Sequence, residues 1–79
     1  MREELIEKVS KLYRSQLDYV NSLKLEIADL KEQIYIGNKS LPHNEYKKLE
    51  RRLKMTESEY EIEVYVAKGM FLAREELLE

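Results

Sequence analysis

Few residues of this 79-residue chain are of the types that carry catalysis or bind metals. The chain has one histidine, His43, and no cysteine, which excludes disulfides, thiolate metal sites and a cysteine nucleophile. His43 falls in an expected turn, where a solvated histidine is far commoner than a catalytic base. With so few ligands of this kind, a zinc site would need carboxylate-rich ligation, so we expect no metal site.

The carboxylates and glycines give no stronger sign of chemistry. Glutamates cluster at Glu57, Glu59, Glu61 and Glu63, but no Glu-x-x-His pair accompanies them, as a di-metal helical bundle requires. The chain also lacks a glycine-rich loop that could hold a phosphate. We therefore expect no enzyme, no cofactor and no small-molecule substrate.

A basic segment spans residues 47–54 and is the one charged feature with a functional interpretation. Residues 37–56 carry 6 basic and 2 acidic side chains, whereas residues 57–79 carry 2 and 7, within a net charge of −2. A solvated helix face is the preferred interpretation, because the chain is acidic overall and no aromatic residues interleave with the cations. The alternative is contact with nucleic acid or with an acidic partner through Lys47, Lys48, Arg51, Arg52 and Lys54.

The elements that must position these residues are two helices. We expect the first over about residues 3–36, where apolar residues follow heptad spacing. Its stripe repeats with steps of three and four residues, and eight of its nine positions are apolar. Gln16 is the polar exception, and we expect it to bond a neighbouring side chain and fix the register. The stripe consists of Ile6, Val9, Tyr13, Gln16, Val20, Leu23, Ile27, Leu30 and Ile34.

A turn over residues 37–42 separates this helix from a second one. Gly37 and Asn38 tolerate the left-handed conformation of a helix C-cap. Pro42 suits a first helical turn, although Asn44 offers a second start. We expect the second helix over about 43–78, antiparallel to the first, with facing residue numbers that sum to about 80. Counted at 100° per residue, its facing stripe is Tyr46, Leu49, Leu53, Tyr60, Val64, Ala67, Phe71 and Leu78.

The stretch from Tyr60 to Val66 alternates apolar and acidic residues and is rich in β-branched types, which by itself is typical of a strand. A strand there would need a partner, and Ile34–Ile36 is the only candidate. The flanking helical periodicity continues through the stretch, so we favour helix. Gly69 costs about 1 kcal/mol in mid-helix relative to alanine, and we take it as a mark of close helix approach.

A second apolar stripe on the second helix has no partner within a two-helix hairpin. It coincides, at the end away from the turn, with extra apolar residues on the first helix. An exposed patch of this kind indicates a binding surface. The expected partner or oligomer interface comprises Leu5, Leu12, Tyr19, Met55, Ile62, Val66, Met70, Ala73 and Leu77.

The sequence therefore predicts an all-α, coiled-coil-like antiparallel hairpin, one domain over 1–79, that dimerises into a four-helix assembly. We expect a non-enzymatic protein–protein interaction module, a small adaptor, regulator or inhibitor acting through its apolar helical surface. The expected partners are a second copy, as homodimer or tetramer, and another protein. The alternative is a dimeric nucleic-acid-binding accessory protein. No apolar run is long enough to cross a membrane, and we expect a cytoplasmic location.

Overall fold

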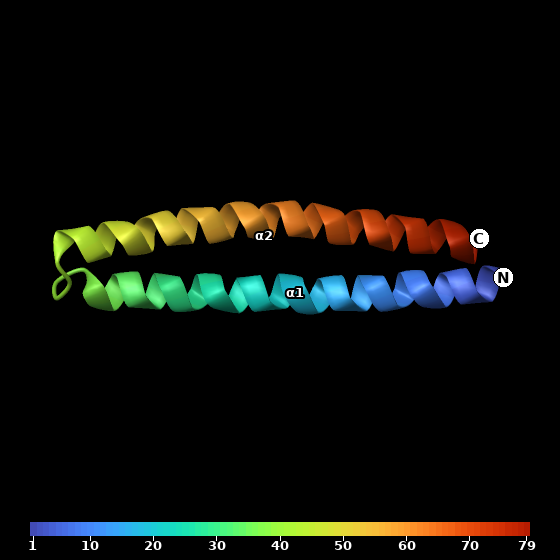
Figure 1. The fold of residues 1–79 in the computed structure, drawn as a ribbon, viewed down its shortest axis with the longest axis horizontal. Coiled ribbons are helices and arrows are strands. Elements are labelled where there is room, and N and C mark those ends of the chain that lie inside the picture. Colours follow the sequence, from blue (N-terminus) through green and yellow to red (C-terminus); the bar gives the residue numbers. More distant parts are fainter.

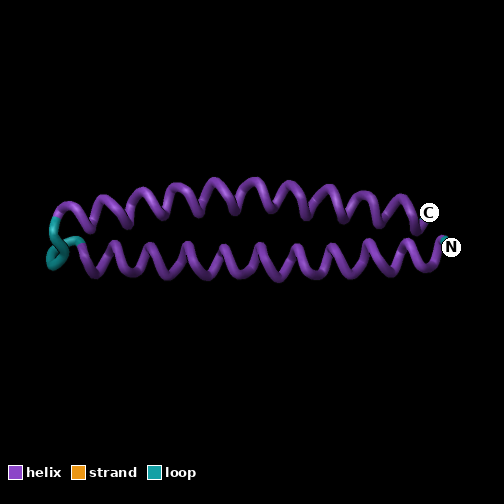
Figure 2. Tube along the Cα trace, viewed as in Figure 1, coloured by secondary structure: helices purple, strands orange, loops and turns teal.

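The computed structural model, which describes residues 1–79, consists of two long antiparallel helices and no strands. Helix α1 spans Arg2–Gly37 and helix α2 spans His43–Leu78, side by side along their whole length (Figure 1). The expected all-helical hairpin is confirmed, and residues 60–66 are helical throughout (Figure 2). The molecule is a rod of 58 × 14 × 13 Å.

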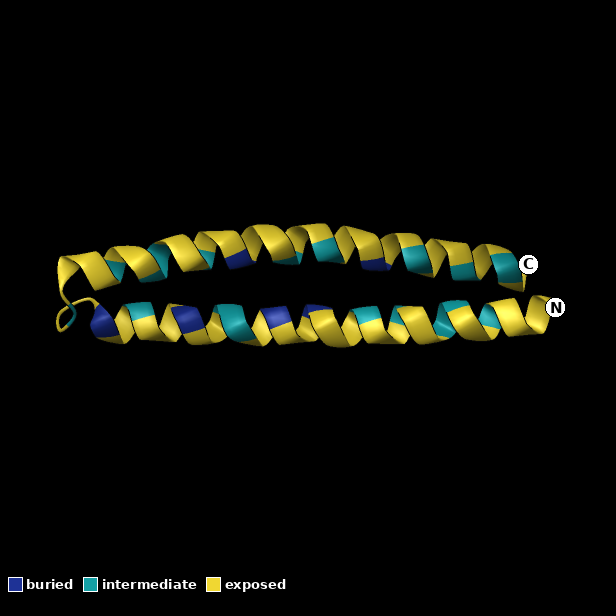
Figure 3. Ribbon diagram, in the orientation of Figure 1, coloured by how far each residue is buried: buried dark blue, intermediate teal, exposed yellow.

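The stripe of α1 faces α2 as its heptad spacing predicts. All nine stripe positions from Ile6 to Ile34 are buried or half-buried, whereas most of the remaining helix is exposed (Figure 3). Val20, Leu23 and Leu30 form the core with Ala67 of α2, and Leu30 is only 1% exposed. The core therefore lies along the middle and the turn half of the rod.

The stripe by which α2 faces α1 differs from the expected one. Val64, Phe71 and Leu78 were expected to face α1, but all three are exposed on its flank. Apart from the half-buried Glu50, the protected positions follow steps of three and four residues, and they are Tyr46, Leu49, Leu53, Thr56, Tyr60, Glu63, Ala67, Met70, Arg74 and Leu77.

This difference has a geometric cause. A straight helix drifts by about 20° per heptad from a 3.5-residue repeat, which accumulates to roughly 90° between Tyr46 and Leu77. Two helices that stay in contact over this length must keep the heptad repeat, so α2 follows the repeat of α1. Counting at 100° per residue therefore placed the first half of α2 correctly and moved the second half onto the flank.

Polar contacts fix the register of the two helices. The Gln16 side-chain amide donates to the Glu63 carbonyl at 2.9 Å and to its carboxylate at 2.6 Å. At the open end, Arg2 Nε donates to the Leu77 carbonyl at 2.8 Å. Both pairs have residue numbers that sum to 79, close to the expected value, and Glu63 is the neighbouring residue that Gln16 bonds.

The turn is built without a left-handed residue, contrary to expectation. Asn38 has φ −53° and ψ −33°, and no residue of the chain has positive φ. Gly37 is needed for space instead, because a Cβ atom there would lie 2.8 Å from Leu41 Cγ and closer still to Cδ1. The Leu41 amide donates to the Gly37 carbonyl at 2.9 Å, and Pro42 then precedes α2 as its N-cap.

Gly69 does not mark close approach of α1 to α2. A Cβ atom built at this position would have no neighbour within 4 Å. The expectation of tight packing at Gly69 within the hairpin is therefore wrong, and the hairpin itself gives no reason for a glycine there.

Candidate interaction surface

Seven of the nine expected interface residues lie on the surface of the hairpin. Their exposure varies, with Met55 at 74% and Ile62 at 62% among the highest. We call this set the outer strip, and it comprises Leu5, Leu12, Tyr19, Met55, Ile62, Val66 and Ala73.

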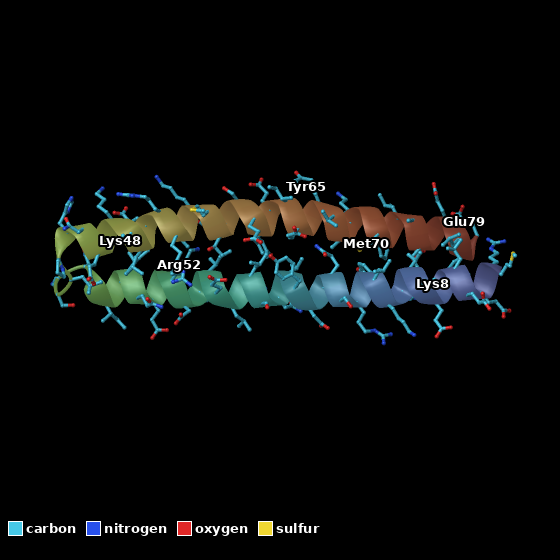
Figure 4. All side chains as sticks on the ribbon, viewed as in Figure 1. Lys8, Lys48, Arg52, Tyr65, Met70 and Glu79 are labelled. Carbon is cyan, nitrogen blue, oxygen red and sulfur yellow. The ribbon has the colours of Figure 1, made fainter.

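The two remaining expected residues are placed differently. Met70 and Leu77 are half-buried and belong to the protected stripe by which α2 faces α1. Met70 accordingly lies between the two helices (Figure 4). The heptad repeat of α2 explains this placement, because it turns both residues inward.

Two contacts across the helices show that both parts of the outer strip share one side of the rod. The Tyr19 hydroxyl donates to the Glu59 carboxylate, and Arg52 pairs with Glu26 at 3.4 Å. Both pairs have numbers that sum to 78. The sum of 78 also holds for Leu12 and Val66, one heptad further toward the open end, and for Leu5 and Ala73, two heptads further. This register places the two members of each pair side by side.

The contact between Tyr19 and Glu59 also changes the acidity of the tyrosine. The hydrogen bond to Glu59 raises the pKa of the Tyr19 hydroxyl above its ordinary value, with smaller contributions from desolvation and from the charges of Glu59, Glu63 and Glu26. The neutral hydroxyl is the form that can donate this hydrogen bond, so Tyr19 stays protonated well above neutral pH.

Tyr65 and Leu72 of α2 are exposed apolar residues that belong to neither of the stripes expected from the sequence. They are 68% and 56% exposed. Tyr65 lies on the outer side of α2 (Figure 4). Ile62 and Gly69 are seven residues apart on the outside of α2, and Tyr65 and Leu72 follow them by three residues each. A heptad count along this side of the helix would therefore have found both.

The opposite flank of the rod carries a smaller apolar set. The Phe71 ring packs against the Tyr13 ring, with the ring centroids 5.9 Å apart and an angle of 50° between the ring planes. Toward the turn, this flank carries an open groove whose lining contains both positive and negative side chains. The lining residues are Lys24, Ile27, Lys31, Glu57, Tyr60, Glu61, Val64, Tyr65 and Lys68. The groove combines both signs of charge and is wide open, so it defines no specific ligand.

The basic segment lies near the turn and is partly neutralised within the chain. Lys47 pairs with Glu50 at 3.7 Å and Arg52 pairs with Glu26. Lys48, Arg51 and Lys54 form no intrachain ion pair. A shallow hollow near the turn is lined by His43, Asn44, Lys47, Lys48 and Arg51.

The remaining candidate groups are dispersed. No three histidine, aspartate or glutamate side chains are placed to hold a metal ion. His43 is exposed at the first residue of α2, and Glu63 is the glutamate of its cluster that turns inward. Neither helix combines the length and apolar content that spanning a membrane would require.

No protein-family model matches the chain, and comparisons with curated proteins and with solved structures found no match.

Proposed function

We propose that the protein is a self-associating, non-enzymatic interaction module, a small adaptor, regulator or inhibitor that works through the outer strip. The observation that carries the proposal is the surface the hairpin leaves uncovered. A compact protein of 9.5 kDa exposes about 5,000 Å², whereas this chain exposes 6,544 Å². The surplus of about 1,500 Å² exceeds what one partner contributes to an interface of standard size.

Part of the outer strip lies where the hairpin buries least. No residue before Val20 is buried, and none after Ala67. Leu5, Leu12 and Ala73 lie in this open half of the rod, whereas Met55 lies toward the turn. Packing two hairpins together along the outer strip would give a four-helix, coiled-coil-like assembly, which is the usual way in which helices with a second apolar face bury it.

The experiment that tests the proposal is solution mass by light scattering over a dilution series. We expect a dimer or tetramer for the parent chain and a monomer for Val66→Asp, with helical content kept in both. Val66 is a better site than Met70, because Met70 also packs between the two helices. The matched control is Leu25→Asp on α1, which changes a residue that is 73% exposed and outside the outer strip. A parent chain that is monomeric at every concentration would refute the proposal.

A second candidate function is binding of nucleic acid through the basic segment. The observation that favours it is the hollow near the turn, where Lys47, Lys48 and Arg51 gather beside His43. A dimer would carry two such clusters, and cations on one helix face are suited to contact phosphates.

This candidate predicts binding that weakens steeply with salt. Lys48→Glu with Arg51→Glu should abolish binding to a labelled duplex or single strand at low ionic strength, as followed by fluorescence anisotropy. Lys8→Glu with Lys11→Glu, on α1, is the control for a change of net charge. Absence of binding by the parent chain at low salt would exclude this function.

A further inference from the structure

The outside of α2 carries a second stripe with heptad spacing, separate from the one that faces α1. Its steps alternate between three and four residues from Lys48 to Glu79, the residue directly after α2, and every member is exposed. The outer stripe of α2 consists of Lys48, Arg51, Met55, Ser58, Ile62, Tyr65, Gly69, Leu72, Glu76 and Glu79.

The outer stripe is complementary to itself when it is read backward. Two cations begin it, two glutamates end it, and apolar or small residues fill the middle. If two copies run antiparallel, facing residues have numbers that sum to 127. The pairs are then Lys48 with Glu79, Arg51 with Glu76, Met55 with Leu72, Ser58 with Gly69, and Ile62 with Tyr65.

We propose that the outer stripe is the self-association surface, and that two copies pair α2 against α2 in antiparallel orientation about a two-fold axis between Ile62 and Tyr65. This inference rests on the proposed function and specifies the partner and its orientation. Such an interface is isologous, since each copy contributes the same patch, and it closes at the dimer.

Charge decides the orientation. A parallel pairing would set Lys48 and Arg51 against the same residues of the second copy, and Glu76 and Glu79 likewise. Like charges brought together in this way oppose the parallel pairing, whereas the antiparallel pairing sets each cation against a carboxylate. Heptad seams with charged ends use such pairs to select partner orientation.

The centre of the outer stripe and the adjoining outer strip supply the apolar contact. Val66 and Ala73 lie along the edge of the stripe and continue onto Leu12 and Leu5 of α1. A standard interface buries about 800 Å² on each partner, which is well within the surplus exposed surface. Gly69 also gains a role, because opposite Ser58 it lets two helix backbones approach closely.

Single-cysteine cross-linking tests the orientation, since the chain has no cysteine of its own. In the proposed dimer, Met55→Cys on one copy lies opposite Leu72→Cys on the other. The two copies of position 55 are then separated by roughly 26 Å along the helix, at 1.5 Å per residue. Mixing the two variants under oxidising conditions should give a disulfide-linked heterodimer, and Met55→Cys alone should give none. Leu25→Cys on α1 is the control that should remain unlinked.

The outcomes separate this inference from the proposed function. A Met55→Cys homodimer would indicate parallel pairing and overturn it. A chain that is dimeric by mass but forms neither link would also overturn it, while leaving self-association intact. A monomeric chain would overturn both.

Charge reversal provides an independent test. Arg51→Glu should weaken the dimer by roughly tenfold, because it faces Glu76 with a like charge. Adding Glu76→Arg in the same chain should restore the parent dissociation constant. Failure of the double variant to recover would contradict the antiparallel pairing.

Discussion

Gln16 and Glu63 are the polar residues that meet in the middle of the two facing stripes. Both are half-buried, and Glu63 accepts the amide of Gln16 through its carbonyl and its carboxylate. No buried side-chain nitrogen or oxygen of the hairpin lacks a partner, and Gln16 is the side chain that donates to the Glu63 carboxylate. A polar pair in an otherwise apolar stripe typically specifies register at some cost in stability.

Replacing Gln16 alone should therefore destabilise the hairpin. Gln16→Leu leaves the half-buried carboxylate of Glu63 without its donor, and we expect the free energy of unfolding in urea to fall by about 1–3 kcal/mol. The double variant Gln16→Leu with Glu63→Leu removes both polar groups and should recover the loss. Glu61→Leu, on the exposed face, is the control that should change little. Equal stability of Gln16→Leu and the double variant would contradict this role.

Tyr19 makes one part of the stability depend on pH. Its pKa in the folded chain lies above the ordinary value of 10.0, so folding favours the protonated hydroxyl. The stability that this hydroxyl contributes is fully present below pH 10.0 and is lost as the pH rises through the folded pKa.

The corresponding measurement compares the parent chain with Tyr19→Phe. Their difference in unfolding free energy should be constant from neutral pH to about pH 9 and shrink at higher pH. Tyr35→Phe changes a tyrosine that is 85% exposed and serves as the control. Parent and Tyr19→Phe curves that stay parallel above pH 10.0 would show that the contact with Glu59 does not contribute.

Among the elements, α1 could be predicted from sequence and α2 only in part. The apolar stripe of α1 is nearly continuous, so its spacing alone identifies the facing residues. On α2, Thr56, Glu63 and Arg74 occupy facing positions, which hides the heptad repeat from a search for apolar residues. Thr56 bonds to the Arg52 carbonyl within α2, whereas Glu63 and Arg74 bond to Gln16 and Ser10 of α1, contacts that depend on the register of the two helices. Only the partner helix reveals them.

The different surroundings of Gly37 and Gly69 can be tested by substitution. Gly69→Ala should raise the unfolding free energy by about 0.5–1 kcal/mol, because alanine favours helix and nothing in the hairpin contacts the new methyl group. Gly37→Ala should be less stable than Gly69→Ala by at least about 1 kcal/mol, since its methyl group collides with Leu41. Both are measured in the Val66→Asp chain, so that self-association does not contribute. Equal effects of the two substitutions would refute the packing described at Gly37.

At the scale of the whole molecule, folding and association should be linked. Only six of 79 residues are buried, which leaves the isolated hairpin with a small core. A partner that binds only the folded chain adds stability through mass action. We therefore expect the apparent Tm of the parent chain to rise with protein concentration.

The Val66→Asp chain should show an apparent Tm that is lower and independent of concentration. Circular dichroism melts over a hundredfold range of concentration measure both effects, with Leu25→Asp as the control that keeps the parent behaviour. A parent Tm that does not change with concentration would indicate that the hairpin is stable by itself.

The contact between Arg2 and the Leu77 carbonyl holds the two ends of the chain together at one end of the rod (Figure 1). Two rods paired in the proposed antiparallel dimer would then present one pair of ends at each extremity. Groups attached to either end of the same copy would lie side by side, and groups on different copies would be held apart by the length of a 58 Å rod. In that arrangement the protein would act as a fixed-length spacer, and we expect energy transfer between terminal dyes to be efficient within a copy and weaker between copies.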